Sequence, residues 1–313
     1  MKKTDRKRKK NSFNFSYAFR SFLGYLEGTS KAENTISSYK SDIGTFQTFL
    51  EQSGKTASSG FRGIGKKDLE IYDNYLKQNS FRTNTRRRKI MTIRKWLTFL
   101  VKRNKIDRVL TSGLPAPAKI ERIPFTVPSD ELIKKVKKLP EETELNLRNK
   151  LLLLVLAETG CRVSEIGPLC YEDFDQEKCE KRTVRCRGKF AREIPVSSDL
   201  KDMVLRLKAK RASDSKYVFS GFNKFGTLNS PITSRGVEIL VKAYAPRLGI
   251  DNLTPRTFRH SAVLYWSRLG ETKENILQYL GLKTDYAFRI YDVMLQKNGE
   301  GLNPTGEPHP FAK

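Results

Sequence analysis

The sequence predicts a mainly α-helical chain of two domains, with one small antiparallel β-hairpin in the second. Apolar residues recur three or four positions apart over long stretches, which is the spacing of one helix face. The stretch KRTVRCRGKFAREIPVS (residues 181–197) instead predicts two short strands around a tight turn at Gly188 and Lys189. At 313 residues, the chain is long enough for two separate cores.

Residues 13–104 predict an N-terminal bundle of four short helices, preceded by a basic, disordered tail over residues 1–12. The helical stretches are NFSYAFRSFLGYLEG, NTISSYKSDIGTFQTFL, KKDLEIYDNYLKQN and NTRRRKIMTIRKWLTFL. The second and fourth stretches resemble each other at an offset of fifty residues. We expect Asn34 or Thr35 to cap the first copy, and Asn84 or Thr85 the second.

A linker over residues 105–125, rich in proline and without a helical period, leads to a second domain over residues 126–297. There the run LLLLVLA predicts a buried helix that ends at Gly160. After the hairpin we expect mostly helix to about Leu295, and then an extended or disordered tail over residues 298–313.

The charge balance predicts a polyanionic partner. The 60 Lys and Arg residues against 34 Asp and Glu residues give a net charge of +26, and nucleic acid is the most abundant cellular polyanion. The N-terminus has no apolar stretch behind its basic residues, and the apolar run is too short to span a membrane. We therefore expect a cytoplasmic, nucleoid-associated protein that does not contact membranes.

Histidine and cysteine usage narrows the chemistry. Two histidines and four irregularly spaced cysteines argue against a zinc site and against Ser-His-Asp catalysis. The chemistry must depend on arginine, lysine, tyrosine and carboxylates, and no metal or other cofactor is expected.

Basic residues in two parts of the chain are candidates for phosphate contacts. Six basic residues surround the apolar stripe of the fourth helix, and their charge predicts DNA contacts, although an ordinary solvated face is the alternative. The four candidates for these contacts are Arg86, Arg87, Arg88 and Lys95. In TGCRVSEI, Arg162 follows the end of the buried helix, where its planar fork suits a phosphate. Glu165, one turn later, orients it or forms only a local salt bridge with it.

TGCRVSEI resembles the first arginine motif, T-G-x-R-x-[ST]-E, of the tyrosine recombinase (phage integrase, Xer-like) family. Further motifs follow in the family's order: Lys189 in the hairpin turn, Arg256-Thr-Phe-Arg259-His260, Leu280-Gly281-Leu282, and Tyr291 nine residues after Leu282. The resemblance covers about residues 14–295. It implies an N-terminal core-binding (SAM-like) four-helix domain and an α+β catalytic domain.

The resemblance implies site-specific DNA recombination, as integration, excision or dimer resolution. Tyr291 would be the nucleophile that forms a 3′-phosphotyrosyl bond, Arg162 and Arg259 would clamp the phosphate, and Lys189 would protonate the leaving oxygen. Neither ATP nor a metal ion would be needed. Four copies would act on two DNA duplexes at a specific site, and DNA-bending accessory proteins are further candidate partners.

Two positions depart from the family pattern. Arg256 and Leu282 stand where the family usually has histidine. Arginine can donate to a phosphate but cannot act as a base, and leucine makes no hydrogen bond. These departures predict a working but slow enzyme. We expect His260 to serve as a structural support.

Three alternatives stay open at this point. Tyr279 and Tyr286 compete with Tyr291 for the nucleophile, although only Tyr291 has the family spacing. The chain could also be a DNA-binding protein that has kept the fold and lost the reaction. A type IB topoisomerase-like enzyme would share the chemistry.

Overall fold

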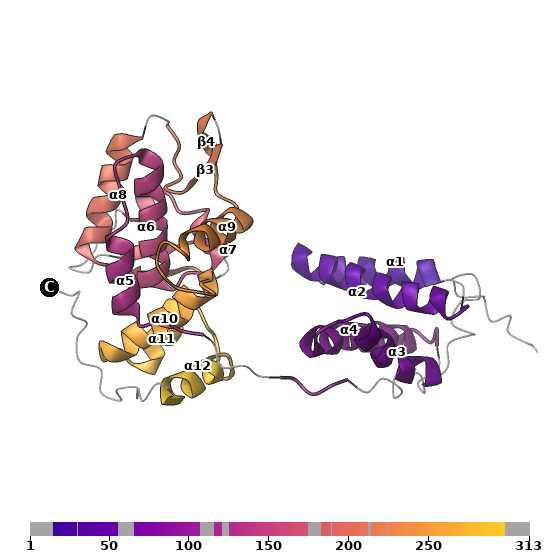
Figure 1. Cartoon of the computed structure of the whole chain (residues 1–313). Coiled ribbons are helices and arrows are strands. Elements are labelled where there is room, and N and C mark those ends of the chain that lie inside the picture. Colours follow the sequence, from indigo (N-terminus) through magenta and orange to yellow (C-terminus); the bar gives the residue numbers. More distant parts are fainter. Residues whose placement is uncertain are drawn as a thin grey trace, which may run out of the picture. The chain divides into compact units, whose positions relative to one another are not determined.

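The computed structural model describes residues 15–29, 31–55, 66–106, 116–120, 125–174, 183–188, 190–211, 214–223 and 225–297. The chain divides into two compact units, Met1–Arg122 and Ile123–Lys313, and each is described by itself (Figure 1). The two predicted tails and most of the predicted linker lie outside the described residues. The detailed domain boundaries therefore stay predictions.

The first unit contains the four predicted helices: α1 (Phe15–Gly28), α2 (Glu33–Gln52), α3 (Lys66–Gln78) and α4 (Thr83–Lys102). Its core is rich in fully buried aromatic rings, and the rings of Phe46 and Tyr72 meet edge to face with centroids 4.9 Å apart. Both α2 and α4 have 20 residues, and they begin fifty residues apart. The internal repeat therefore corresponds to two equivalent helices of one bundle.

The predicted helix caps of this unit are wrong. Ala32 precedes α2 and Arg82 precedes α4 as the N-cap residues, and neither side chain makes a capping bond. The predicted caps lie inside the first turns: Asn34, Thr35, Asn84 and Thr85. Asn84 has another partner, because its side-chain amide exchanges two hydrogen bonds, of 2.9 and 3.0 Å, with the backbone of Ile120.

A buried carboxylate joins the two repeat helices. Asp42 of α2 is fully buried and accepts hydrogen bonds from three side chains of α4: Arg88 at 2.5 Å, Lys89 at 3.2 Å and Thr92 at 2.9 Å. A buried charge is stable only when it is paired and hydrogen-bonded. Part of the positive charge of α4 is therefore neutralised by a carboxylate inside the bundle.

The second unit is built around one buried helix. Its helices are α5 (Ser129–Lys137), α6 (Glu144–Thr159), α7 (Val163–Ile166), the 3₁₀ turn η3 (Tyr171–Asp173), α8 (Ser198–Lys210), α9 (Ser234–Tyr244), α10 (Pro255–Arg268), α11 (Lys273–Leu280) and α12 (Asp285–Lys297). Every residue of α6 from Leu147 to Thr159 is buried, and α5, α8 and α10 pack around it. As predicted, α6 ends at Gly160, whose φ of +53° favours glycine.

Two antiparallel hairpins complete this unit. The first pairs β1 (Thr183–Cys186) with β2 (Arg192–Pro195), as predicted, and places Cys186 opposite Arg192. The second pairs β3 (Ser220–Asn223) with β4 (Gly226–Pro231) across an irregular register. This second hairpin interrupts the mostly helical stretch expected after the first one, and the mainly helical fold class is confirmed.

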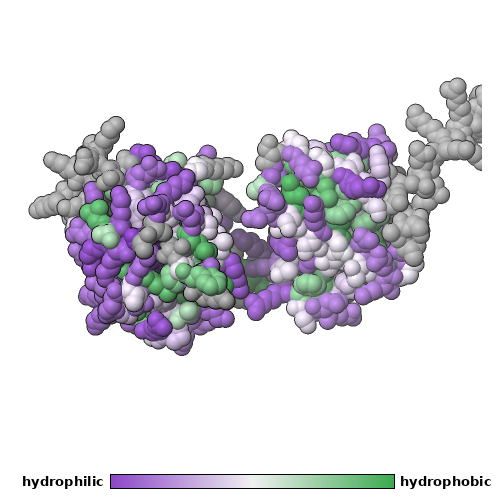
Figure 2. All heavy atoms as spheres, turned by 90° about the horizontal axis from the view of Figure 1, so that it is seen from above, coloured by the Kyte–Doolittle hydropathy of each residue, from purple (hydrophilic) through white to green (hydrophobic). Residues whose placement is uncertain are grey.

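Hydrophilic residues cover most of the face shown in Figure 2, and apolar residues gather there in small patches. Among the described residues, no helix is both long enough and apolar enough to span a bilayer.

Candidate active site

Arg259 is held between the ends of two helices. It lies on α10, whose start is fixed by a capping box at Thr254. The buried guanidinium donates from Nη1 to the carbonyl of Gly160 at 2.7 Å, and from Nη2 to that of Leu280 at 2.6 Å. These carbonyls end α6 and α11, where a helix carries unpaired acceptors and partial negative charge. Neutral carbonyls thus orient this arginine and leave its positive charge for an anion.

Arg162 is anchored beside Arg259 by the same turn. It is the N-cap of α7, and its Nη2 donates to the carbonyl of Gly281 at 3.3 Å. Glu165 accepts from the backbone N–H of Arg162 at 2.7 Å and from its Nη1 at 3.0 Å. The Arg162 side chain is 31% exposed, so a ligand can reach it. The adjacent carbonyls of Leu280 and Gly281 therefore fix both predicted clamp arginines.

Arg192 is a residue of this site that the sequence analysis missed. It lies on β2, and its side chain is 3% exposed. Its Nη1 and Nη2 donate to the two carboxylate oxygens of Glu165 at 2.8 and 2.9 Å, and its Nε donates to the carbonyl of Tyr279 at 2.5 Å. The signal in the sequence was its place in the strand, where it shares the buried face with Ile194.

Glu165 is consequently shared between two arginines. Burial alone would raise the pKa of its carboxyl, but the hydrogen bonds and charge of Arg192, together with Arg162, hold that pKa below its usual value. The carboxylate stays ionised and orients Arg162. The sequence left open whether Glu165 orients Arg162 or only forms a salt bridge with it. In the structure the salt bridge is itself the contact that orients Arg162.

Tyr291 lies against the same cluster. It is on α12, is 6% exposed, and packs against His260 and Phe288 with ring centroids 5.5 and 5.4 Å away. Burial lowers the pKa of the Arg259 guanidinium, and interactions with the neighbouring Tyr291 side chain act in the opposite direction. The phenol therefore lies beside one of the two phosphate-binding candidates.

The competing tyrosines lie in different surroundings. Tyr279 packs edge to face on Trp266 at 5.3 Å, and its hydroxyl donates to Glu271 at 3.3 Å. Burial and the charge of Glu271 raise the pKa of this phenol, which disfavours the phenolate. Tyr286 is 78% exposed. Neither has the surroundings of Tyr291.

The remaining motif residues, Arg256, Leu282 and His260, differ in their exposure to solvent. Arg256 is exposed on the first turn of α10, four residues before His260. Leu282 packs on the apolar core. Burial, followed by the charges of Arg256 and Arg259, lowers the pKa of His260 to about 4, so its ring is neutral at pH 7. Its buried Nδ1 has no hydrogen-bond partner in the described part of the chain.

The predicted lysine, Lys189, lies outside the described residues. Its neighbours on both sides are described. Gly188 has a φ of +97°, a conformation that favours glycine in a tight turn, and the ring of Phe190 lies 4.9 Å beneath the Arg162 guanidinium. The residue that follows the lysine therefore contacts Arg162.

One group in this unit has the composition of a metal site. Ligand atoms of Cys161, Glu165 and Cys186 lie within 4.8 Å of one another, and the two sulfurs are 3.0 Å apart. Two guanidinium groups already occupy the Glu165 carboxylate, and they would repel a cation. These side chains fit a structural role better than metal binding.

The four basic residues of α4 that were predicted to contact DNA differ in burial and in their hydrogen-bond partners. Arg86 is buried and donates to Asp73 at 3.2 Å, and Arg87 donates to the carbonyl of Pro117 at 2.7 Å. Arg88 stays half exposed while it pairs with Asp42, and Lys95 is exposed. Arg86 is thus the least available of the four for a phosphate.

Two protein-family models match the chain. Residues 129–292 match the phage integrase family, and residues 19–104 match the phage integrase N-terminal SAM-like domain. The chain is 29% identical over 285 residues to the tyrosine recombinase XerC of Herpetosiphon aurantiacus, covering 86% of this chain and 88% of the relative.

Two solved structures share the fold. A lambda integrase dimer bound to a COC′ core site has a TM-score of 0.67 at 16% identity, covering 89% of this chain and 95% of the other. A lambda integrase tetramer bound to a Holliday junction has a TM-score of 0.66 at 13% identity, covering 90% and 83%. The family match over residues 129–292 spans more than half of the chain, and this range contains the arginine and tyrosine motifs. The chain belongs to the phage integrase family of tyrosine recombinases, which cleave and rejoin DNA in site-specific recombination.

Proposed function

We propose that Tyr291 is the nucleophile of this recombinase. Its phenolic oxygen would attack a DNA phosphodiester, forming a 3′-phosphotyrosyl bond while the bond to the 5′ oxygen breaks. The observation that carries the proposal is the cluster of Tyr291, Arg259 and Arg162, in which two arginines are fixed by one turn. The covalent bond preserves the phosphodiester for rejoining.

The two arginines have a clear electrostatic task in this reaction. Attack on phosphorus adds negative charge to the non-bridging oxygens, and donors that are already oriented stabilise that charge most. Arg162 and Arg259 are held by backbone carbonyls and by Glu165, so little reorganisation is needed. Arg256, exposed nearby on α10, would add a third donor to the phosphate.

Lys189 completes the proposal from the family resemblance. An ammonium at this position would give a proton to the leaving 5′ oxygen, which becomes a hydroxyl. Arg192 would act indirectly, because it touches Glu165 and the last turn of α11 rather than the phosphate. It is a positioning residue for Arg162.

The partners and place of action follow from the reaction. We propose that four copies act on two DNA duplexes that carry a specific site, at the nucleoid in the cytoplasm. The lambda integrase complexes with a core site and with a Holliday junction support this assembly. The charge of +26 supports DNA as the partner.

One observation favours a second candidate function. Leu282 packs on the apolar core where the family usually has a phosphate-binding histidine. A DNA-binding protein that has lost cleavage would retain the fold and the charge without needing that histidine.

A nicked suicide substrate separates the two functions. Cleavage close to the nick releases a short fragment and traps the covalent adduct. We expect an adduct with the wild type and with Tyr286→Phe, the matched control, and none with Tyr291→Phe. Absence of an adduct with the wild type on its own site would support the binding-only protein.

A further inference from the structure

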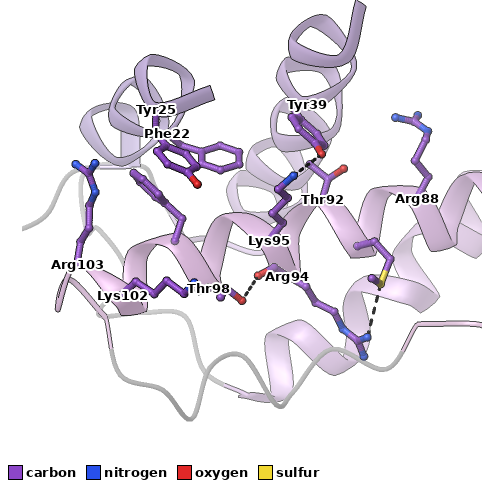
Figure 3. A pocket seen from close by; sticks show the side chains of 12 residues that line it. Phe22, Tyr25, Tyr39, Arg88, Thr92, Arg94, Lys95, Thr98, Lys102 and Arg103 are labelled. Atoms are coloured by element: carbon purple, nitrogen blue, oxygen red, sulfur yellow. Dashed lines mark hydrogen bonds between the residues drawn. The ribbon is translucent and has the colours of Figure 1, made fainter. Parts of the chain in front are cut away.

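A pocket of about 760 Å³ opens on the first unit between α1, α2 and α4, and none of the residues proposed to act on the scissile phosphate lines it (Figure 3). We call it the α1–α4 pocket. Figure 3 shows Phe22 and Tyr25 entering it from α1, Tyr39 from α2, and a row of α4 side chains along its other side. Pockets of this volume are large enough for a drug-sized ligand.

Aromatic rings form one wall of this pocket. The centroid of Phe99 lies 5.2 Å from that of Phe22 and 5.0 Å from that of Tyr25. Tyr25 is 44% exposed although it belongs to this cluster. A partly exposed ring beside packed rings offers a rigid flat surface to another planar group.

Cations form much of the rest of the lining, beside Met91, Thr92 and Thr98. The Lys95 ammonium lies 3.0 Å from the Tyr39 hydroxyl and 5.1 Å from the centre of its ring, and the Arg103 guanidinium lies 4.6 Å from the centre of the Phe99 ring. Arg94 and Lys102 also line the pocket, as does Arg88, whose charge is paired with that of Asp42. None of the twelve described residues that line it is acidic. The ligand should therefore combine negative charge with a planar ring.

We propose that the α1–α4 pocket binds an unpaired nucleotide of a DNA strand. Aromatic stacking surfaces next to cations are the combination by which proteins hold single strands, because every base has a flat face and every nucleotide a phosphate. A fully paired duplex keeps its base faces stacked inside the helix and leaves the aromatic wall unused. An acidic peptide would match the cations but not the planar surface.

The proposed reaction produces such nucleotides. Strands cannot be exchanged between duplexes unless base pairs open, so unpaired bases must exist for part of the reaction. A role of the pocket in strand exchange therefore rests on the proposed function. Binding of an unpaired nucleotide does not depend on that function and is measured separately.

The test is fluorescence anisotropy of the full-length protein with three labelled probes: an oligothymidylate, a fully paired duplex of equal charge, and thymidine monophosphate. We expect Tyr25→Ala to weaken oligothymidylate binding about tenfold, the loss of one base–aromatic stack, while duplex binding stays unchanged. Tyr25→Phe keeps the ring and should bind like the wild type. Tyr17→Ala is the matched control, because Tyr17 is an exposed tyrosine of the same helix outside the pocket.

Three outcomes overturn the proposal. Equal loss on single strand and duplex makes the pocket part of an ordinary duplex surface, and no loss on either removes Tyr25 from binding. Binding of thymidine monophosphate as tightly as the oligonucleotide assigns the pocket to free nucleotides. The covalent adduct of Tyr291 is scored in a separate assay, so failure of the proposed cleavage is distinguishable from failure of this pocket.

Discussion

Arg192→Lys is the substitution that best tests how the site is positioned. Lysine keeps the positive charge but replaces a planar fork with one ammonium. It would lose the paired contacts to both Glu165 oxygens, at 2.8 and 2.9 Å, and would leave the carbonyl of Tyr279 without the 2.5 Å donor. The change therefore removes geometry while charge is held constant.

The size of the effect follows from these contacts. Hydrogen bonds to a charged group contribute about 1.5–3 kcal/mol each, and the lysine recovers part of one. We expect the free energy of unfolding to fall by about 2–4 kcal/mol. Glu165 would also orient Arg162 less well, so the first-order rate of adduct formation should fall about 10- to 100-fold, which corresponds to about 1.4–2.8 kcal/mol of barrier.

The matched control is Arg185→Lys on the neighbouring strand. Arg185 pairs with Glu193 at 3.4 Å, and both side chains are about half exposed. An exposed pair contributes about 0–1 kcal/mol, so this variant should behave like the wild type. Urea unfolding gives the stability, and single-turnover cleavage below the unfolding transition gives the rate. If both substitutions had the same small effect, the positioning role of Arg192 would be refuted.

Three further predictions concern the buried polar groups and the turn after α11. Asp42→Ala leaves the buried Lys89 ammonium, whose side chain is 4% exposed, without its carboxylate, so urea unfolding followed by tryptophan fluorescence should show a loss of about 3–5 kcal/mol. His260 has a pKa of about 4 when folded and about 6.5 when unfolded. Between pH 4 and pH 6.5 the unfolded chain therefore binds a proton that the folded chain does not. The free energy of unfolding should be highest above pH 6.5 and should fall by up to about 3 kcal/mol as the pH is lowered to 4. Urea midpoints against pH measure this slope, which His260→Gln should flatten. Gly281→Ala adds a Cβ 3.1 Å from that of Phe190 at a φ of +59°, so adduct yield should fall because the carbonyl that holds the first clamp arginine moves.

The sequence predicted the elements whose signal is local. The apolar spacing of α2 and α4, the continuous apolar run of α6, and the Gly188 turn each depend on residues close together in the chain. Pairing between β3 and β4 lacks such a signal, because its short strands are partly exposed and its register is irregular.

Charged residues were the harder part of the site. Arg192 reads as one more basic residue in a basic chain, and its partner Glu165 lies 27 positions earlier. Arg86 and Arg88 suggested a surface for DNA, but Asp73 and Asp42 from other helices pair with them. Tertiary contacts decide whether an arginine is available to bind a phosphate, and these contacts cannot be inferred from the spacing of residues along the chain.

Peptide mapping of the trapped adduct tests most directly whether Tyr291 is the nucleophile. Trypsin cuts after Lys283 and Arg289, so Tyr279, Tyr286 and Tyr291 fall into three different peptides. After nuclease digestion, we predict that a nucleotide 3′-phosphate remains on the peptide Ile290–Lys297, which contains Tyr291 and no other tyrosine. The same mass added to either of the other two peptides would contradict the assignment.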